Sequence, residues 1–215
     1  NNNSTDRSTD IARKWIHRDP RFTLLHESKQ GVMHASNTGS MAARGIFIAR
    51  MDADDWSYPE RLQMQAAFLV HNPEYGAVSG LVKHIGHPVN SKGMARYVGW
   101  VNSVRTYPEI LNARFMESPL INPTAMWTRE VAMKHGTYRC GNFPEDYEMQ
   151  LRYLSKGAKM AKLTEKQLEW HDYSTRLTRT DKRYSTEAFF QTKAFYFKKW
   201  SEQHNPFHPN IWIWG

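Results

Sequence analysis

The chain has 215 residues, of which 40% are hydrophobic and 23% charged, and this length favours one domain with a sizeable buried core. No run of about 18 apolar residues is present, which excludes a membrane-spanning helix. The single cysteine, Cys140, excludes an intramolecular disulfide and a zinc site built mainly from thiolates. The formal net charge of +8 suits nucleic acid, an anionic lipid or an anionic substrate as a partner, and it equally suits a solvated basic surface.

Helices and short apolar strands alternate along the chain, which is typical of an α/β layered fold. In chain order, the pattern predicts a helix at 8–17, a strand at 22–25, a helix at 33–44, a strand at 46–51, a helix from residue 59, a strand at 77–82, a helix at 107–114, a strand at 124–128, a helix at 145–156, strands at 159–163 and 168–171, a helix at 187–202 and a strand at 211–215. Residues 85–103 show little periodicity and are predicted to form a long loop.

Glycine and proline set several of these boundaries. Gly45 ends the helix at 33–44 well because it tolerates a positive φ, and Pro59 suits the first turn of the next helix. On that next helix Leu62, Ala66 and Leu69 are predicted to face the core.

Three carboxylates follow a predicted strand. Asp52, Asp54 and Asp55 lie where open α/β sheets usually bind ligands. No Lys or Arg falls among them, so the cluster is costly unless the groups hydrogen-bond, take up protons or bind a cation. A divalent ion held by one or two carboxylates and by substrate phosphates meets this need, and a helix-capping aspartate with solvated neighbours is the alternative. An EF-hand loop is excluded, because the sixth position from Asp52 is Ser57 rather than Gly and the twelfth is Gln63 rather than Glu.

An ordered set of short motifs resembles those of the family 2 glycosyltransferases. The motifs are Asn3-Ser4-Thr5-Asp6, Gly31 through Asn37-Thr38-Gly39, Ala43-Arg44-Gly45, Asp52-Ala53-Asp54-Asp55, Pro123-Thr124 and Glu145-Asp146-Tyr147-Glu148. Each motif is weak alone, but the ordered set is specific and covers most of the chain to residue 185. The resemblance implies a GT-A type α/β fold, a Rossmann-like mixed sheet flanked by helices. It also implies an enzyme that transfers a sugar from a nucleoside-diphosphate sugar to an acceptor hydroxyl with inversion.

The resemblance also implies roles for the acidic residues. By the family pattern Asp54 coordinates the metal, Mn²⁺ or Mg²⁺, and Asp52 contacts the donor ribose or the metal. Asp146 is the expected catalytic base, and Glu145 is the alternative. A carboxylate at the start of a helix suits that role because neighbouring backbone amides fix its orientation, but both residues would also suit a simple helix cap.

Trp170-His171 and Arg176-Leu177-Thr178-Arg179 resemble a tryptophan and arginine stretch found in one branch of the family. Arg176 and Arg179 are expected to pair with the donor diphosphate, since guanidinium matches phosphate oxygens in a bidentate way. A solvated face is the alternative for both. His171 stands where that branch has Arg, and it is a candidate ligand of the metal or of phosphate, with packing as the alternative.

Further positions near the start of the chain concern the donor pocket. Asn37 and Gly39 are expected to shape it, beside Ser36, which stands where the family has Arg. Asn1 and Asn2 stand where the family has aspartates, one of which recognises the nucleotide base.

The expected organisation is a catalytic domain at 1–185, followed at 186–215 by a C-terminal helix and strand that lead into a further unit. The family's first strands and first helix would precede the opening turn and are missing, so the catalytic domain is expected to be incomplete at its N-terminus. We therefore expect a fragment cut at both ends that binds nucleotide sugar weakly and turns over poorly.

The expected partners are a nucleoside-diphosphate sugar and a glycan or lipid-linked glycan acceptor, in the synthesis of bacterial surface polysaccharide or lipopolysaccharide. No nucleic acid and no membrane span are expected, and the expected location is the cytoplasm, with the inner face of the membrane as an alternative. Three rival functions stay open: a metal-dependent nucleotidyltransferase with the same carboxylates, a nucleic-acid-binding module, and a non-catalytic relative. The acidic trio and the lack of a recognised binding motif argue against the nucleic-acid module.

Overall fold

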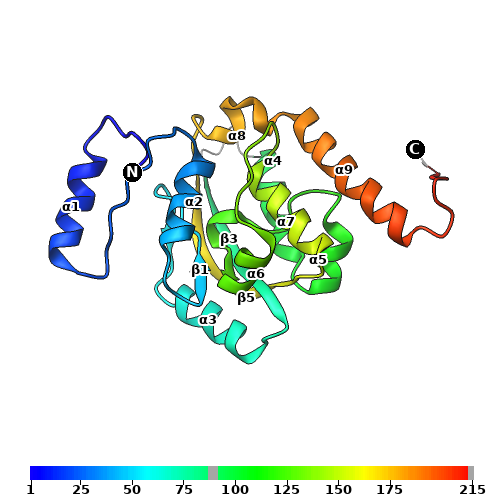
Figure 1. The fold of residues 1–215 in the computed structure, drawn as a ribbon, viewed down its shortest axis with the longest axis horizontal. Coiled ribbons are helices and arrows are strands. Elements are labelled where there is room, and N and C mark those ends of the chain that lie inside the picture. Colours follow the sequence, from blue (N-terminus) through cyan, green and yellow to red (C-terminus); the bar gives the residue numbers. More distant parts are fainter. Residues whose placement is uncertain (87–91, 213–215) are drawn as a thin grey trace.

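The computed structural model describes residues 1–86 and 92–212, and a five-stranded sheet lies at its centre (Figure 1). The strands are β1 (Phe47–Ala49), β2 (Trp56–Ser57), β3 (Tyr75–Gly86), β4 (Met126–Thr128) and β5 (Lys159–Asp172), in the spatial order β1-β4-β3-β5-β2. β3 and β5 run parallel, whereas the other neighbours are antiparallel. The predicted α/β class and mixed sheet are confirmed.

Helices surround this sheet. Those in the described part of the chain are α1 (Ser8–Arg18), α2 (Val32–Ala42), α3 (Arg61–His71), α4 (Lys92–Ser103), α5 (Tyr107–Ala113), α6 (Arg129–His135), α7 (Glu145–Ser155), α8 (Leu177–Thr180) and α9 (Thr186–His204), with 3₁₀ turns η1 (Asn122–Thr124) and η2 (Lys182–Tyr184). Local sequence explains several starts. Thr106 and Glu109 form a capping box on α5, and the Ser185 hydroxyl accepts a hydrogen bond from the Ala188 amide on α9.

The sheet is a middle layer, because consecutive residues of its strands pack on opposite faces. Ala77 of β3 and Trp127 of β4 belong to the main core cluster, which includes buried side chains of α5 and α7. Their chain neighbours Val78 and Met126 pack instead against Leu69 of α3. α7 is the most deeply buried of these helices, since nearly all of its side chains are buried.

The long β3–β5 pair is irregular in its middle. The pairing register shifts between Ser79 and Val82, and Gly80 lies at the shift. A Cβ atom on Gly80 would lie 1.8 Å from Cγ of Gln167, so a larger residue there would push the two strands apart. Beyond the shift both strands continue, to Gly86 and Asp172.

α1 lies beside the sheet and its covering helices rather than among them (Figure 1). None of its residues is buried, and Trp15 is half exposed. The predicted strand at 22–25 is wrong, because this segment pairs with no strand in residues 1–86 and 92–212. Asn2 holds the segment that follows, because its side-chain amide donates to the carbonyls of Glu27 and Lys29, both at 2.8 Å.

Several predicted elements differ from the observed ones. Residues 92–103 of the predicted long loop form α4, which buries Val98 and Val101, while residues 87–91 lie outside the described part. The two strands predicted at 159–163 and 168–171 are one strand, β5, with exposed residues at 164–166. The predicted terminal strand is not observed at residues 211 and 212, and 213–215 lie outside the described part.

The buried side of α3 also differs from the prediction. Leu69 is buried as expected, but Leu62 is 55% exposed. Arg61 and Gln65 take the buried positions instead, at 1% and 0% exposure. Arg61 donates to the Arg50 carbonyl and Gln65 to the Thr124 carbonyl, and these hydrogen bonds satisfy polar groups that burial would otherwise penalise.

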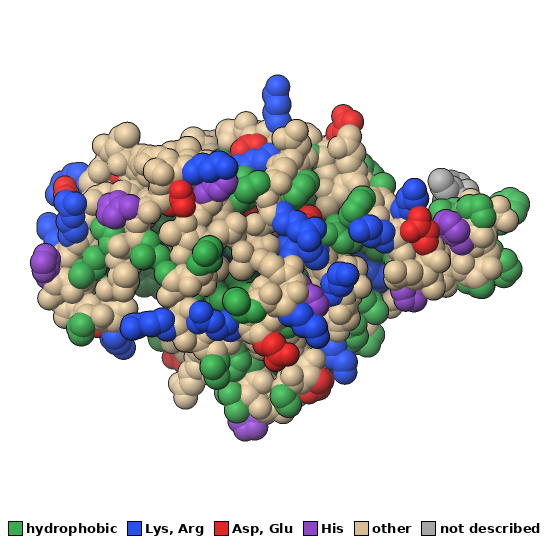
Figure 2. Space-filling view, viewed as in Figure 1, with side chains coloured by type: hydrophobic (Ala, Val, Ile, Leu, Met, Phe, Trp, Pro, Cys, Tyr) green, Lys and Arg blue, Asp and Glu red, His purple; other side chains and the backbone are tan. Residues whose placement is uncertain are grey.

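Two surface properties bear on the predicted partners. Lys and Arg side chains are dispersed over the face shown in Figure 2, with hydrophobic side chains between them. Across residues 1–86 and 92–212, no helix has both the length and the apolar character that crossing a membrane requires.

Candidate functional site

A cavity of about 580 Å³ joins the acidic loop after β1 to the start of α7. Asp52, Asp54, Glu145, Asp146 and Arg176 are among its lining residues. Segments that are far apart in the sequence therefore meet at one site.

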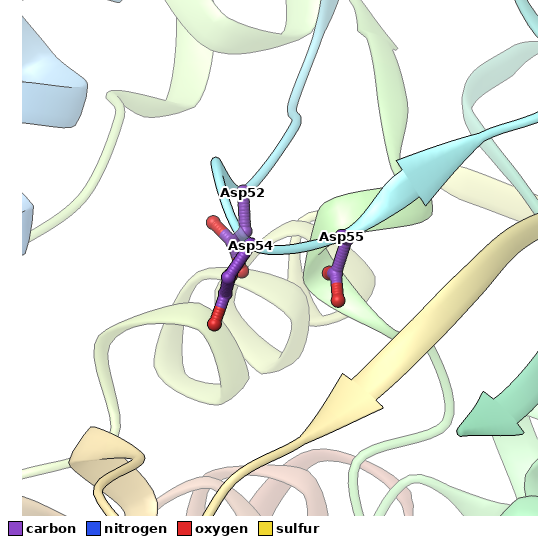
Figure 3. Close-up of side chains that lie close together, drawn as sticks. All are labelled: Asp52, Asp54 and Asp55. Carbon is purple, nitrogen blue, oxygen red and sulfur yellow. The ribbon is translucent and has the colours of Figure 1, made fainter. Parts of the chain in front are cut away.

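The three aspartates after β1 form a compact group. Their carboxylates offer oxygen atoms that all lie within 4.8 Å of one another (Figure 3). Asp55 Oδ1 accepts a hydrogen bond from the backbone amide of His171 at 2.9 Å, whereas Asp55 Oδ2 is buried without a hydrogen-bond partner. Burial, helped by the charges of Asp52 and Asp54, raises the pKa of Asp55 to about 6. A buried, unpartnered carboxylate oxygen beside two more carboxylates fits a hard divalent cation.

Two arginines support this loop, although no cation falls among the aspartates in the sequence. Arg50 forms an ion pair with Asp52. Arg61 lies beneath the loop, fully buried, and its Nη2 donates to the Arg50 carbonyl at 2.6 Å. Burial lowers the pKa of Arg61 to about 10, and the charges of Asp52 and Asp55 oppose that shift. The sequence pointed to neither arginine, and the residues predicted to face the core on α3 were Leu62, Ala66 and Leu69.

Glu145 and Asp146 open α7 and have different partners. Both carboxylate oxygens of Glu145 accept from the Tyr184 hydroxyl, at 2.8 and 2.7 Å. Asp146 accepts from the backbone amide of Tyr147 at 2.8 Å, and no side chain in the described part donates to it. Burial, followed by the charges of Glu145 and Asp52, raises the pKa of Asp146 to about 7. Of the two carboxylates, Asp146 is therefore the one without a side-chain hydrogen-bond donor among the described residues.

The two predicted diphosphate-binding arginines both pair with the Asp172 carboxylate, Arg176 at 3.9 Å and Arg179 at 2.8 Å, but they differ in their access to the cavity. Arg176 lines the cavity, with its guanidinium carbon 4.2 Å from the centre of the Trp170 ring. Arg179 is not among the lining residues, and its Nη2 donates to Asp172 at 2.8 Å. The His171 ring does not belong to the compact carboxylate group, and its Nδ1 is buried without a hydrogen-bond partner.

Asn37 and Gly39 do not line this cavity. The Asn37 side chain forms two hydrogen bonds with the backbone of Tyr138, at 2.8 and 3.0 Å. Gly39 lines a separate groove between α2 and β1. Asn37 reaches the cavity indirectly, because the Tyr138 hydroxyl donates to Asn122 Oδ1 at 2.9 Å, and Asn122 is a lining residue.

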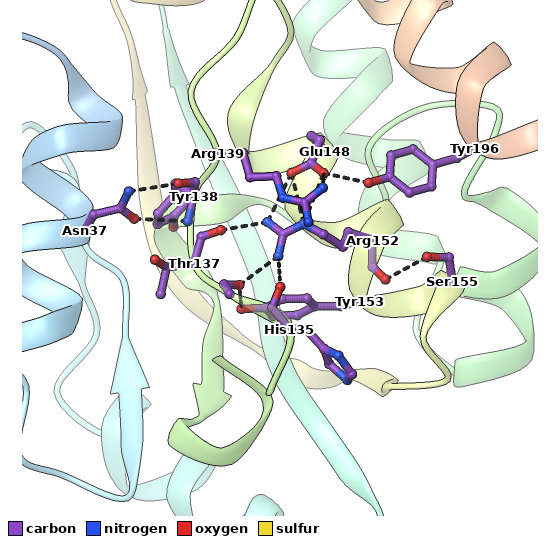
Figure 4. A network of polar contacts seen from close by, with 11 residues as sticks. Asn37, His135, Thr137, Tyr138, Arg139, Glu148, Arg152, Tyr153, Ser155 and Tyr196 are labelled. Carbon is purple, nitrogen blue, oxygen red and sulfur yellow. Dashed lines mark hydrogen bonds and ion pairs between the residues drawn. The ribbon is translucent and has the colours of Figure 1, made fainter. Parts of the chain in front are cut away.

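A buried ion pair on α7 holds the segment that leads to Tyr138 (Figure 4). Arg152 Nε donates to Glu148 at 3.0 Å, and its other nitrogens donate to the carbonyls of His135, Gly136 and Thr137. The Tyr196 hydroxyl of α9 donates to the same glutamate at 2.6 Å. α7 thus carries the candidate base in its first turn and the Glu148–Arg152 ion pair in the residues that follow.

Solved structures share this fold. The chain is similar to S. aureus TarS 1-349 in complex with UDP-GlcNAc, with a TM-score of 0.66 and 16% identity over 93% of this chain and 56% of that one. It is also similar to the mannosyltransferase PcManGT from Pyrobaculum calidifontis in complex with GDP-Man and Mn²⁺, with a TM-score of 0.56 and 17% identity over 94% of this chain and 64% of that one. The GT-A fold is confirmed.

Curated relatives are glycosyltransferases. The putative glycosyltransferase EpsH of Bacillus subtilis is 45% identical over 60 residues, which is 28% of this chain and 17% of EpsH. The amylovoran biosynthesis glycosyltransferase AmsE of Erwinia amylovora is 24% identical over 153 residues, which is 71% of this chain and 55% of AmsE. The chain thus spans about half, or less, of these relatives. The sequence profile described as glycosyl transferase family 2 matches residues 1–137, and we conclude that the chain belongs to this family.

Proposed function

We propose that this chain carries the catalytic site of an inverting glycosyltransferase that uses a nucleoside-diphosphate sugar, assisted by a divalent metal ion. The observation that carries the proposal is the single cavity lined by Asp52, Asp54 and Asp146. The acceptor hydroxyl gives its proton to Asp146 as its oxygen attacks the anomeric carbon. The bond from that carbon to the diphosphate breaks, and the nucleoside diphosphate leaves from the opposite face.

Each group has a place in this reaction. Asp52, Asp54 and Asp55 would hold Mn²⁺ or Mg²⁺, which offsets the charge that develops on the leaving diphosphate. Arg176 can turn from the Trp170 ring toward the diphosphate, where its guanidinium would add bidentate contacts. Glu145, fixed by Tyr184, raises the proton affinity of its neighbour Asp146.

The similarity to AmsE, which is named for amylovoran biosynthesis, supports a glycan acceptor in cell-surface polysaccharide synthesis. The similarity to structures that hold UDP-GlcNAc and GDP-Man supports a nucleotide-sugar donor. Asn37 and Gly39 are assigned supporting roles in this proposal, because neither residue lines the cavity. Arg179 is assigned to positioning through Asp172, and His171 to placing Asp55 through its backbone amide.

The test is product analysis with a panel of UDP- and GDP-sugars and Mn²⁺, compared with the same mixture containing EDTA. We expect metal-dependent release of nucleoside diphosphate and a product with inverted anomeric configuration in its NMR spectrum. Release of pyrophosphate would instead identify a nucleotidyltransferase. Absence of any metal-dependent product from every donor would refute the proposal.

A further inference from the structure

One wall of the cavity is a segment without regular structure before η1. This wall segment, residues 117–122, ends with the first residue of η1 and supplies several of the lining side chains. Three successive carbonyls in it accept hydrogen bonds from three different elements: Ser118 from Tyr97 Oη of α4 at 3.0 Å, Pro119 from Lys162 Nζ of β5 at 2.9 Å, and Leu120 from Gln150 Nε2 of α7 at 3.0 Å. An irregular segment held at consecutive carbonyls has little freedom to move.

Gln150 links the wall segment directly to the helix of the candidate base. Besides its bond to the Leu120 carbonyl, its Oε1 accepts from the Ser118 hydroxyl at 3.1 Å and from the Leu120 amide at 3.3 Å. Gln150 is buried and lies four residues after Asp146, so both side chains share one face of α7. The position of the wall relative to Asp146 is therefore set by α7 itself.

Lys162 is a buried group that the proposed reaction does not use. Its side chain lies in the interior of the fold and is not among the cavity-lining residues. In the described part of the chain its Nζ donates to the carbonyls of Val101 and Pro119 and pairs with no carboxylate. Burying an amine without an anionic partner costs free energy that an apolar side chain would not. What Lys162 contributes instead is a fixed link between α4 and the wall segment.

We propose that Tyr97, Gln150 and Lys162 are positioning residues that hold the wall segment as the acceptor-binding surface beside Asp146. This rests on the proposed function, in which Asp146 takes the proton of the acceptor hydroxyl. The donor diphosphate lies against the aspartate loop, so the wall that is fixed to the helix of the base meets the acceptor. A wall segment held in one position favours the reactive orientation of the bound acceptor hydroxyl.

The anchoring is tested by amide hydrogen exchange in the full chain. Lys162→Met and Tyr97→Phe each remove a donor and keep most of the side chain. We expect faster exchange at 117–122 in both variants, with unchanged exchange at 52–55 and 145–148. Asn102→Ala is the matched control, because Asn102 also makes two backbone hydrogen bonds from α4, but to Val82 of β3. Unchanged exchange at 117–122 in both variants would overturn the proposal, and this readout does not depend on activity.

The acceptor role is tested by kinetics with UDP-GlcNAc and GDP-mannose as donor probes and p-nitrophenyl glycosides as acceptor probes. We expect KM for the glycoside to rise about ten-fold in Lys162→Met and Tyr97→Phe, which corresponds to the loss of one or two hydrogen bonds. KM for the donor should stay unchanged, and so should both constants in Asn102→Ala. An unchanged glycoside KM, or equal rises for donor and glycoside, would contradict an acceptor role. Failure of the proposed function is distinct, since the unsubstituted protein would then release no nucleoside diphosphate.

Discussion

Asp146 and Glu145 are adjacent carboxylates with different environments. Glu145 accepts both of its hydrogen bonds from Tyr184, whereas Asp146 has only a backbone donor and a pKa raised to about 7 by burial and by the charge of Glu145. A general base works best when its pKa lies near the working pH. These environments support the proposal that Asp146, the expected base, acts as the base rather than its alternative Glu145.

For Asp146→Asn we expect kcat to fall by on the order of 10²–10⁴-fold, because the variant cannot take up the proton. Donor binding should be preserved. Since only the ionised carboxylate acts as a base, kcat/KM of the unsubstituted protein should fall as the pH drops below about 7. Glu145→Gln should lose less activity, and a larger loss in Glu145→Gln than in Asp146→Asn would reverse the assignment.

Lys162 predicts a pH dependence of stability. Burial lowers its pKa from 10.5 to about 7, so between these two values the unfolded chain binds a proton that the folded chain does not. The free energy of unfolding, measured relative to Lys162→Met, should therefore rise from pH 7 to pH 10.5 and level off above that. Urea unfolding of both proteins across this range measures the difference, and a constant difference would contradict the buried, neutral amine.

At the scale of elements, α7 joins the proposed base, Asp146, to two anchoring systems, Gln150 on the wall segment and the Arg152–Glu148 pair on residues 135–137. The helix predicted at 145–156 is confirmed, because the apolar spacing and the acidic first turn both favour a helix there. The polar anchors could not be predicted, since a Gln or Arg at a buried helical position finds its partners only in the folded chain.

Arg152→Met is expected to lower the free energy of unfolding by about 3–5 kcal/mol, because it leaves Glu148 buried without its main cation. Arg139→Ala is the matched control. The Arg139 side chain is 60% exposed and lies 3.5 Å from the same glutamate, so its loss should cost about 1 kcal/mol or less. Denaturant unfolding of both variants tests this contrast, and equal losses would show that burial does not set the strength of the pair.

α4 and β5 show why some elements escaped prediction. α4 contains Gly93 and Gly99 and follows residues rich in Gly, Pro and Asn, so its local sequence favours a loop. Burial of Val98 and Val101 stabilises the helix in the folded chain. β5 carries the polar residues 164–166 in its middle, and these interrupt the apolar pattern although pairing with β3 continues on both sides. In both elements tertiary packing outweighs local propensity.

For the whole molecule, the acidic cluster and the start of α7 could be located from the sequence, because each follows from a motif at an element boundary. Their meeting in one cavity, and the placing of Asn37 away from it, required the three-dimensional fold. Arg50 and Arg61 were missed because an ion pair and a buried guanidinium leave no mark in a single sequence.

The proposed cation site at Asp52, Asp54 and Asp55 predicts a coupled ligand response of the whole fold. A nucleoside diphosphate and Mn²⁺ together should raise Tm more than the sum of their separate effects, because the ion is shared by the carboxylates and the phosphates. A ligand at 100 times its Kd adds about 2.7 kcal/mol to the free energy of unfolding. The double variant Asp52→Asn, Asp54→Asn should abolish the coupled shift, and a coupled shift that persists in it would place the ion elsewhere.

The parallel pairing of β3 with β5 has a consequence for synthesis of the chain. Tyr75 pairs with Lys159 and Gly86 with Asp172, so β3 lacks its longest neighbour until more than eighty further residues have been made. At 5–20 residues per second the ribosome needs roughly 5–20 s for that stretch. During this interval the unpaired backbone edge of β3 can pair with other nascent chains. The yield of folded protein in the cell should therefore depend on chaperones that bind this strand.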